Sequence, residues 1–170
     1  MTRVAVLTVS TAGARGERED TSGDAIVAWA KRHKYELADR ALVSDDVTAI
    51  VNALARWCDS AAADLVLTTG GTGLSPTDVT PEATKIVIER DAPGIAELLR
   101  VSVLDRFPKA ALSRGVAGVR NRTLIVNLPG SPSGVKDSLK ALDAIVDHAV
   151  AVLRGEVTSH EKASTTKKRR

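Results

Sequence analysis

The chain has 170 residues and a net charge of +3; 44% of its residues are apolar and four are aromatic. This length suits one domain that buries roughly 70% of its unfolded surface, and a second domain is not expected. The single cysteine, Cys58, excludes an intramolecular disulfide and a zinc cluster of several thiolates, and it favours a reducing cytoplasm. With so few aromatic residues, the core must consist mainly of Val, Leu, Ile and Ala, which suits buried parallel strands covered by helices.

The positive charge is confined to the C-terminal end. Residues 156–170 contain two acids and five bases, so this segment alone carries +3 and residues 1–155 are neutral overall. We expect one domain over residues 1–155 and a basic, disordered tail over residues 156–170. A neutral domain with few aromatic residues predicts no nucleic-acid surface. The apolar run of about six residues near the start, with none approaching twenty elsewhere, predicts neither a secretory signal nor a membrane span.

The first half of the chain predicts strands that alternate with helices. Apolar β-branched runs indicate buried strands, and apolar residues spaced by three and four indicate helices with one buried face. Thr21 or Ser22 is expected to cap the first helix. In chain order the pattern predicts a strand, a loop, a helix, a strand, a helix and a strand over residues Val4–Val9, Ser10–Asp20, Thr21–His33, Tyr35–Val43, Val47–Cys58 and Leu65–Thr68.

The second half begins with a helix for which Thr80 supplies the capping hydroxyl and Pro81 the first helical position. The two β-rich segments that come later are separated by only two residues, a spacing that fits an antiparallel hairpin and makes the sheet mixed. The expected elements are a helix to about Arg90, a break at Asp91–Gly94, a helix over Ile95–Arg106, strands Gly115–Arg120 and Thr123–Leu128, and one last helix that opens at Ser131–Gly134 and continues to about Gly155.

A glycine-rich run, Thr68–Gly73, directly succeeds the third strand. Ligands bind at the carboxyl ends of strands in open α/β sheets. Three glycines among four residues let the backbone approach a ligand closely and form a concave nest of N–H groups for an anion. The run is not a Walker loop, since it lacks a subsequent Gly-Lys-Ser/Thr, and Pro76 stands where the dinucleotide fingerprint needs its third glycine. A tight turn explains one or two glycines, whereas the whole run favours a cradle for a phosphate or a pterin.

Asp45 and Asp78 are candidate ligands of a divalent metal. An acid just before a helix commonly serves only to stabilise the helix start, by about 0.3–1 kcal/mol. After Asp78, however, Thr80 is already expected to fill the capping position. Two unit charges 4 Å apart repel by about 4 kcal/mol at an effective dielectric of 20, so a carboxylate beside a bound phosphate requires a cation between them. Asp45 ends the second strand at the same edge of the sheet. Taken alone, Asp45 and Asp46 are more often simple helix caps.

A second rigid loop, Asn127–Ser131, comes after the last strand and ends at a helix start. Its proline and glycine suffice for chain reversal, but Asn127 can read the edge of a nucleobase or ribose and the loop amides can receive phosphate. Ser113 and Arg114 add a hydroxyl and a fixed positive charge that both suit phosphate, although an exposed arginine usually serves only solubility.

These motifs together resemble the MogA/MoaB-type molybdopterin adenylyltransferase family, which includes the G domains of the plant and animal molybdenum-cofactor proteins. The resemblance covers about residues 3–154, and the glycine run with the subsequent Asp-Val-Thr-Pro-Glu-Ala is its most specific part. The segments that carry it, in order, are Asp20–Gly23, Ser44–Asp46, Thr69–Gly73, Asp78–Ala83, Leu112–Arg114 and Asn127–Gly130.

The resemblance implies a three-layer α/β/α sandwich with a mostly parallel sheet, commonly assembled as a homotrimer. It implies a cytoplasmic enzyme that transfers AMP from Mg-ATP to the terminal phosphate of molybdopterin and releases pyrophosphate. The adenylylated product then passes to a downstream protein that inserts the molybdenum. The loop Ser10–Asp20 carries Gly13, Gly16 and several charges but no aromatic residue, and it corresponds to a variable part of the family, so apart from Asp20 its residues receive no assigned contact.

Carried over by position, Asp45 and Asp78 resemble the acidic pair that binds Mg²⁺ and supports adenylyl transfer. Thr69–Gly73 and Ser113 resemble positions that contact pterin and phosphate, and Asn127–Ser131 resembles part of the nucleotide side. The full set expected to contact substrate or nucleotide is Asp20, Ser22, Gly23, Thr69, Gly70, Gly71, Thr72, Gly73, Thr80, Glu82, Ser113, Arg114, Asn127, Pro129, Gly130 and Ser131.

Three alternatives stay open at the level of sequence. One is a MoaB-type paralogue that binds molybdopterin without efficient adenylylation, which the retention of Asp45 and Asp78 disfavours. Another is a non-catalytic assembly domain, and the third is a related domain that hydrolyses a nucleotide diphosphate.

Overall fold

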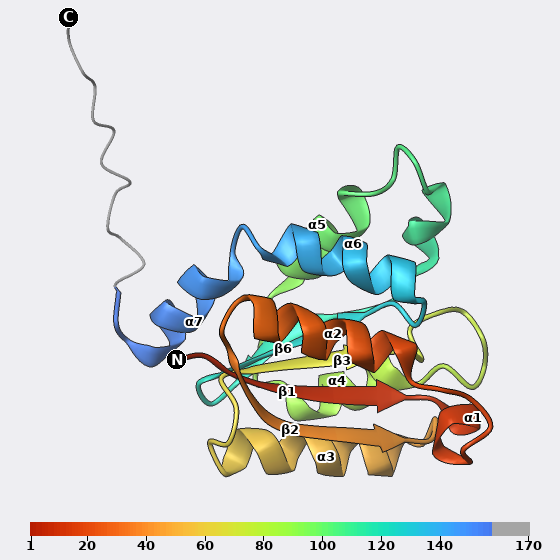
Figure 1. The fold of residues 1–170 in the computed structure, drawn as a ribbon, viewed down its shortest axis with the longest axis horizontal. Helices are drawn as coiled ribbons and strands as arrows, with labels where there is room; N and C mark the ends of the chain where they lie inside the picture. Colours follow the sequence, from red (N-terminus) through yellow and green to blue (C-terminus); the bar gives the residue numbers. More distant parts are fainter. Residues whose placement is uncertain (158–170) are drawn as a thin grey trace, which may run out of the picture.

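Six strands form a central sheet that carries helices on both faces (Figure 1). The structure is a computed structural model that describes residues 1–157, so the expected tail, apart from its first two residues, lies outside the described part of the chain. The strands are β1 (Arg3–Val9), β2 (Glu36–Val43), β3 (Leu65–Thr69), β4 (Arg90–Asp91), β5 (Ala117–Arg120) and β6 (Thr123–Leu128). The helices are α1 (Thr11–Ala14), α2 (Thr21–Arg32), α3 (Val47–Asp59), α4 (Thr80–Val87), α5 (Pro93–Val101), a 3₁₀ helix (Pro108–Leu112), α6 (Pro132–Leu142) and α7 (Val146–Arg154).

The strand order is β2-β1-β3-β6-β5-β4, and the first four of these strands run parallel. β5 pairs antiparallel with both β6 and β4. The turn between β5 and β6 has two residues, and Asn121 adopts the left-handed conformation there with a φ of 53°. The predictions of a three-layer sandwich, a mostly parallel sheet and an antiparallel hairpin are therefore confirmed.

Alternate residues of the central strands face two separate cores. Val4 and Val6 of β1 pack in the core beneath α2, α5, α6 and α7, whereas Ala5 and Leu7 pack in the core against α3 and α4. In Figure 1, α2 and α6 lie above the sheet and α3 lies below it. Burial on both faces explains why these strands are apolar throughout instead of alternating with polar residues. Within residues 1–157, none of the helices is both long enough and apolar enough to cross a membrane.

The segment expected as a loop after β1 contains a short helix, α1. Ser10 caps α1 by accepting a hydrogen bond from Gly13 N (3.0 Å). The expected cap of α2 at Thr21 or Ser22 is wrong, because Asp20 accepts from Gly23 N (2.9 Å) and the helix begins one residue later.

The expectations for the chain after the glycine run are wrong at three points. Thr80 is the first residue of α4 and not its cap, since Val79 occupies that position without a side-chain hydrogen bond. α4 ends at Val87 and not near Arg90, because Arg90 and Asp91, at the border between the expected helix and the expected break, pair with β5 as strand β4. α5 begins at Pro93 and ends at Val101, and a 3₁₀ helix that the pattern did not indicate comes after it.

The single last helix expected from the apolar stripe is instead two helices. α6 ends at Leu142 and α7 begins at Val146. Asp143 caps α6 and accepts a hydrogen bond from Nε1 of Trp29 (2.7 Å) in α2. The break therefore coincides with a tertiary contact that the periodicity of the sequence does not contain.

Candidate active site

The carboxyl ends of the parallel strands meet at one edge of the sheet. Thr8 of β1 lies opposite Thr69 of β3, and Thr69 lies opposite Leu128 of β6. The chain passes from β1 to β2 on one side and returns to β3 on the other, with α2 and α3 on opposite faces. β1 and β3 therefore flank a topological switch point, where open α/β sheets bind their ligands.

The glycine loop, Thr69–Gly73, is held in place by its carbonyl groups. Thr80 donates to two of them, from its hydroxyl to that of Gly70 (2.9 Å) and from its N–H to that of Gly71 (3.1 Å). Arg114 donates to the next two, from its N–H to the carbonyl of residue 72 (2.8 Å) and from Nε to that of residue 73 (2.7 Å). Within residues 1–157 the N–H groups of residues 71–73 have no acceptor from the protein, so they remain available to an anion.

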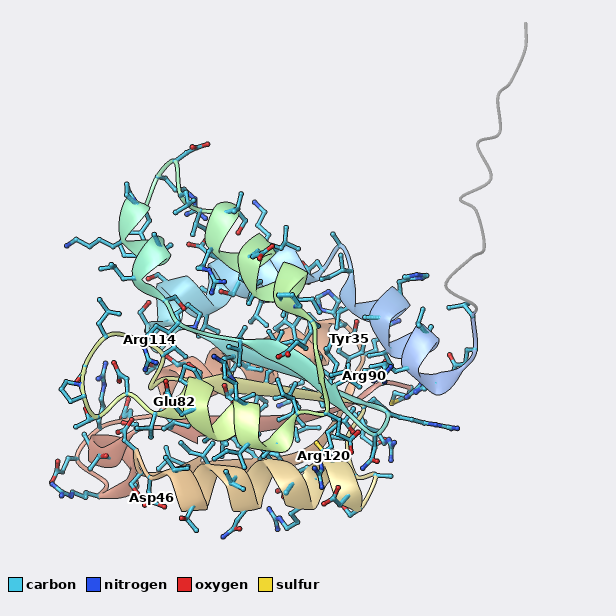
Figure 2. The ribbon with its side chains drawn as sticks, turned by 180° about the vertical axis from the view of Figure 1, so that it is seen from behind. Tyr35, Asp46, Glu82, Arg90, Arg114 and Arg120 are labelled. Carbon is cyan, nitrogen blue, oxygen red and sulfur yellow. The ribbon has the colours of Figure 1, made fainter. Side chains whose placement is uncertain are left out.

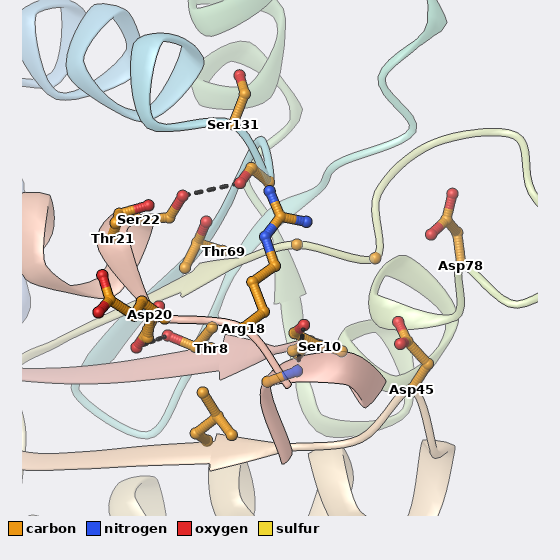
Figure 3. Close-up of a pocket in the computed structure, with 17 residues that line it drawn as sticks. Thr8, Ser10, Arg18, Asp20, Thr21, Ser22, Asp45, Thr69, Asp78 and Ser131 are labelled. Atoms are coloured by element: carbon orange, nitrogen blue, oxygen red, sulfur yellow. Dashed lines mark hydrogen bonds between the residues drawn. The ribbon is translucent and has the colours of Figure 1, made fainter. Parts of the chain in front are cut away.

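Asp45 and Asp78 both lie against the glycine loop. A Cβ atom on Gly71 would lie 3.3 Å from Oδ1 of Asp45, and a Cβ atom on Gly73 would lie 2.8 Å from Oδ2 of Asp78. The other carboxylate oxygen of Asp45 accepts from the N–H (3.0 Å) and the hydroxyl (2.7 Å) of Thr11 in α1. Figure 3 shows both carboxylates on the same side of the pocket. The fold thus brings together the two acids that were expected to share a metal.

The two carboxylates suit a magnesium ion that is shared with a phosphate. Within the described residues no three His, Cys, Asp or Glu side chains form a metal-binding cluster. Mg²⁺ requires six oxygen ligands, is commonly held by one or two carboxylates and takes its remaining ligands from substrate phosphates and water. Asp45 and Asp78 are the two carboxylates that could hold such an ion, and its remaining ligands would come from a phosphate and water.

Asp20 connects β1, α2 and β2 beside the same site. Its carboxylate accepts from Thr8 Oγ1 (2.8 Å), from Gly23 N (2.9 Å) and from Arg40 Nη2 (2.7 Å). Burial alone would raise the pKa of Asp20, but the hydrogen bonds from Arg40, Thr8 and the amide of Gly23 outweigh it and hold that pKa below its usual value. The carboxylate is therefore ionised at neutral pH and its charge is offset by Arg40.

Two cavities meet at the glycine loop. The first, here called the polar cavity, has a volume of about 390 Å³ and lies among the ends of β1 and β3 and the chain between α1 and α2 (Figure 3). The second, here called the apolar cavity, has a volume of about 370 Å³ and is lined on one side by Leu99, Val103 and Phe107 of the segment from α5 onward. The residues that line both cavities are Gly71, Asp78, Gly130 and Ser131.

Most of the sequence-predicted site residues line one of these cavities. Those in the polar cavity are Asp20, Ser22, Asp45, Thr69, Gly70, Gly71, Asp78, Gly130 and Ser131. Those in the apolar cavity are Gly71, Thr72, Gly73, Asp78, Ser113, Asn127, Pro129, Gly130 and Ser131. The two loops are also tied to each other and to α2, because Thr69 Oγ1 donates to the carbonyl of Pro129 (2.6 Å) and Ser22 Oγ donates to that of Gly130 (2.8 Å; Figure 3).

Gly23, Thr80, Glu82 and Arg114 line neither cavity. Gly23 supplies the capping N–H at the start of α2, and Thr80 is fully buried beneath the glycine loop. The Arg114 guanidinium is paired with Glu82 (Figure 2) and donates from Nη2 to the carbonyl of Asp78 (2.7 Å). The hydrogen bond from Arg114 lowers the pKa of Glu82. Arg114, which is paired with Glu82, thus holds the loop that carries Asp78 in place, and neither of these two side chains lines a cavity.

Asn127 is 4% exposed, and both ends of its carboxamide bond to the protein. Its amide nitrogen donates to Thr68 Oγ1 (3.0 Å) and Thr84 Oγ1 (2.9 Å), and its oxygen accepts from Val116 N (3.1 Å). The edge expected to read a nucleobase is therefore occupied by internal hydrogen bonds.

Several residues that line the cavities were not predicted from the sequence. The polar cavity also contains Arg18 and Glu19, from the segment that received no assigned contact. The apolar cavity also contains Arg100 and Lys109 together with an apolar wall. The cluster of charges between Gly13 and Asp20 was visible in the sequence, but only the course of α1 and the turn after it decides which of them faces the site.

The fold and the site define an α/β domain that carries a glycine loop and two carboxylates at a topological switch point, and within residues 1–157 the N–H groups of residues 71–73 in that loop donate to no protein acceptor. The family model described as the probable molybdopterin binding domain matches residues 5–148, and the chain belongs to that family.

Similar proteins cover nearly the same span. The chain is 38% identical over 154 residues to a molybdopterin adenylyltransferase of Helicobacter pylori, an alignment that covers 89% of this chain and 88% of the relative. It is 37% identical over 143 residues to a molybdopterin adenylyltransferase of Escherichia coli K12, with 82% and 73% covered. The crystal structure of the molybdopterin biosynthesis enzyme MoaB from Thermus thermophilus is 50% identical, with a TM-score of 0.87 over 91% of this chain and 98% of that one.

Proposed function

We propose that the protein catalyses the Mg-ATP-dependent adenylylation of molybdopterin, with release of pyrophosphate. The observation that carries the proposal is the meeting of two cavities at Gly71, Asp78, Gly130 and Ser131. A transfer between two phosphate-bearing substrates requires two binding sites whose phosphates come within bonding distance. The names of relatives that are 37–38% identical to this chain support the same activity.

The character of each cavity suggests which substrate it receives. The polar cavity, lined by the ends of β1 and β3 and by hydroxyl and carboxylate groups, suits the sugar and phosphates of a nucleotide. The apolar cavity offers Leu99, Val103 and Phe107 to a flat pterin ring, and Arg100 and Lys109 supply positive charge. In this arrangement the terminal phosphate of molybdopterin and the α-phosphate of ATP meet over the glycine loop.

The reaction requires alignment and charge neutralisation. An oxygen of the molybdopterin phosphate attacks the α-phosphorus of ATP, a new P–O–P bond forms, and pyrophosphate leaves with the electron pair of the broken P–O bond. Because the attacking oxygen is already anionic, no side chain has to act as a strong base. The N–H groups of residues 71–73 would donate hydrogen bonds to the phosphate oxygens on which negative charge develops while one P–O bond forms and the other breaks.

Asp45 and Asp78 would hold Mg²⁺ against the phosphates. The ion would neutralise charge on the α-phosphate and on the departing pyrophosphate. Thr11 orients the carboxylate of Asp45, whereas Asp78 is held through its backbone carbonyl by Arg114 and through its carboxylate by Ser75 N (3.2 Å).

Incubation with molybdopterin and Mg-ATP, with release of pyrophosphate measured over time, tests the proposal. We expect one pyrophosphate for each adenylylated molybdopterin, and we expect Asp78→Asn to abolish turnover while the fold and pterin binding are retained. Asp46→Asn is the matched control, because Asp46 caps α3 through Ala49 N (2.7 Å) outside both cavities and asparagine caps as well as aspartate.

Other outcomes would point to the rival functions. Turnover of Asp78→Asn at the wild-type rate would refute the role of that carboxylate. Tight pterin binding without pyrophosphate release would favour a binding paralogue. Release of AMP from a nucleotide diphosphate without pterin would favour a hydrolase. A partner protein that co-purifies with a chain unable to bind nucleotide would favour an assembly domain.

A further inference from the structure

Arg18 lies in the chain between α1 and α2 and lines the polar cavity. Figure 3 shows its side chain extending from this chain segment across the pocket, toward the side on which Ser22 and Ser131 lie. Neither the motifs in the sequence nor the mechanism above assigns it a role.

The charged side chains that line the polar cavity are mostly acidic. Among the described residues that line the cavity there are four carboxylates, on Glu19, Asp20, Asp45 and Asp78, and Arg18 is the one cation. Arg40 offsets the charge of Asp20, and a magnesium ion would offset Asp45 and Asp78. A polyphosphate in this cavity still carries several negative charges of its own, so it requires a further cation beside it.

Arg18 is also free to serve an external anion. Within residues 1–157 it makes no ion pair and no side-chain hydrogen bond to the protein, whereas Arg40 and Arg114 are each paired with an acidic side chain. A guanidinium presents a planar fork of N–H donors that matches two phosphate oxygens at once.

We propose that Arg18 is a binding residue for the β- and γ-phosphates of the nucleotide, and that it selects a triphosphate over an uncharged nucleoside. The inference rests on the proposed function for the identity of the ligand. The phosphate chain then lies between the guanidinium on one side and Asp45, Asp78 and the glycine loop on the other. The pyrophosphate portion stays bound while the α-phosphorus is attacked.

Direct binding measurements with Mg²⁺ and inorganic triphosphate, and separately with adenosine, test this role by calorimetry. Charge-assisted hydrogen bonds of this kind correspond to roughly a 10- to 100-fold change in affinity. We expect Arg18→Ala to weaken triphosphate binding by that factor, and to leave adenosine binding within about twofold. Arg18→Lys keeps the positive charge but loses the planar fork of donors, so its affinity for triphosphate should lie between those of the wild type and Arg18→Ala.

Arg15→Ala is the matched control. Arg15 belongs to the same segment, is exposed and does not line the polar cavity, so its removal lowers the net charge equally without touching the site. Thermal unfolding of all variants should match the wild type, since neither side chain is buried. A similar loss of triphosphate affinity in Arg15→Ala and Arg18→Ala would overturn the proposal, because it would show an effect of net charge alone.

The outcomes separate this inference from the proposed function. If the wild type adenylylates molybdopterin and Arg18→Ala binds triphosphate normally, the inference fails and the function stands. If the wild type binds triphosphate through Arg18 and adenylylates nothing, the function fails and the inference stands. A wild type that binds no triphosphate, or an Arg18→Ala variant that loses adenosine equally, also contradicts the inference.

Discussion

Gly70 adopts a backbone conformation that leaves no room for a side chain. Its φ is 96°, and a Cβ atom on it would lie 2.2 Å from the carbonyl oxygen of Val9 in β1. The left-handed region alone costs a non-glycine residue on the order of 1–3 kcal/mol, and the collision with a backbone atom adds to that cost. The close approach of the glycine loop to β1 therefore depends on the absence of a side chain at this position.

We expect Gly70→Ala to lower the free energy of unfolding by roughly 3 kcal/mol or more, since conformational strain and overlap act together. Urea denaturation monitored by circular dichroism measures this. Gly94→Ala is the control, because Gly94 lies in the first turn of α5 with nothing within 4 Å of the added Cβ atom. That substitution should raise stability by about 0.5–1 kcal/mol. Equal denaturation midpoints for the two variants would contradict the strained geometry of the loop.

At the level of single residues, the sequence predicted those parts of the site that adjoin strand ends. Asp45, Asp78 and the glycine loop each come after a strand, and parallel strands bring the loops at their carboxyl ends to one edge of the sheet. Arg18 was not predictable in this way, because its segment contains charges of both signs, and only the folded path of α1 and the turn after it decides which of them line the cavity. The contacts of Arg114 with Asp78 and Glu82 were not predictable either, because they depend on where α4 packs, and the local sequence does not specify that position.

At the level of elements, Asn127 joins β6, β3 and α4 behind the glycine loop. Its amide reaches hydroxyls of Thr68 and Thr84, both fully buried, and its oxygen receives the N–H of Val116. A buried polar group without a partner costs about 1–3 kcal/mol. Truncation of one side chain would therefore leave several such groups unsatisfied at once.

We expect Asn127→Ala to lower the free energy of unfolding by roughly 3 kcal/mol, and to leave the preference for ATP over GTP unchanged in the folded fraction. Urea titration and competition binding measure the two effects. Asn52→Ala, on an exposed position of α3, is the control and should be neutral or slightly stabilising because alanine is the better helix former. A stable Asn127→Ala protein with altered base preference would instead support direct contact with the nucleotide.

The elements that the sequence predicted best are those whose pattern is set by burial. The central strands are apolar throughout because two cores cover them, and the apolar stripes of α2 and α3 face those cores directly. The elements it missed are short and depend on tertiary contacts. β4 has two residues and exists through pairing with β5, α1 has four residues, and the break between α6 and α7 accompanies the bond from Trp29 to Asp143.

At the level of the whole molecule, one carboxylate connects the two ends of the described chain. Asp64 is 5% exposed and accepts hydrogen bonds from Arg3 in β1 (2.8 Å to Nη2) and from Arg154 in α7 (2.6 Å to Nη2). Arg154 also donates to the carbonyl of Met1 (2.8 Å). These residues lie at the opposite end of the strands from the candidate active site, so they affect stability without touching the chemistry.

This network predicts how stability depends on pH. Burial alone would raise the pKa of Asp64, but the hydrogen bonds from Arg3 and Arg154 outweigh it and hold the pKa well below its usual value near 4. A carboxyl whose pKa is lower in the folded state contributes stability above the unfolded pKa, and that contribution is lost as pH falls toward the folded pKa. The wild type should therefore lose stability between about pH 5 and pH 2.

We expect Asp64→Asn to lower the free energy of unfolding at pH 7 by about 3 kcal/mol, because it leaves two arginines without their shared acid, and to flatten the loss of stability below about pH 5. The slope that remains belongs to groups such as Asp59, whose pKa is lowered by its hydrogen bond with Arg120. Denaturant titrations at several pH values compare the variant with Asp105→Asn, which removes the same charge from an exposed position and should keep the wild-type slope. Parallel slopes for the wild type and Asp64→Asn would place the acid sensitivity elsewhere, since a group that no longer titrates cannot contribute to the proton uptake that accompanies unfolding.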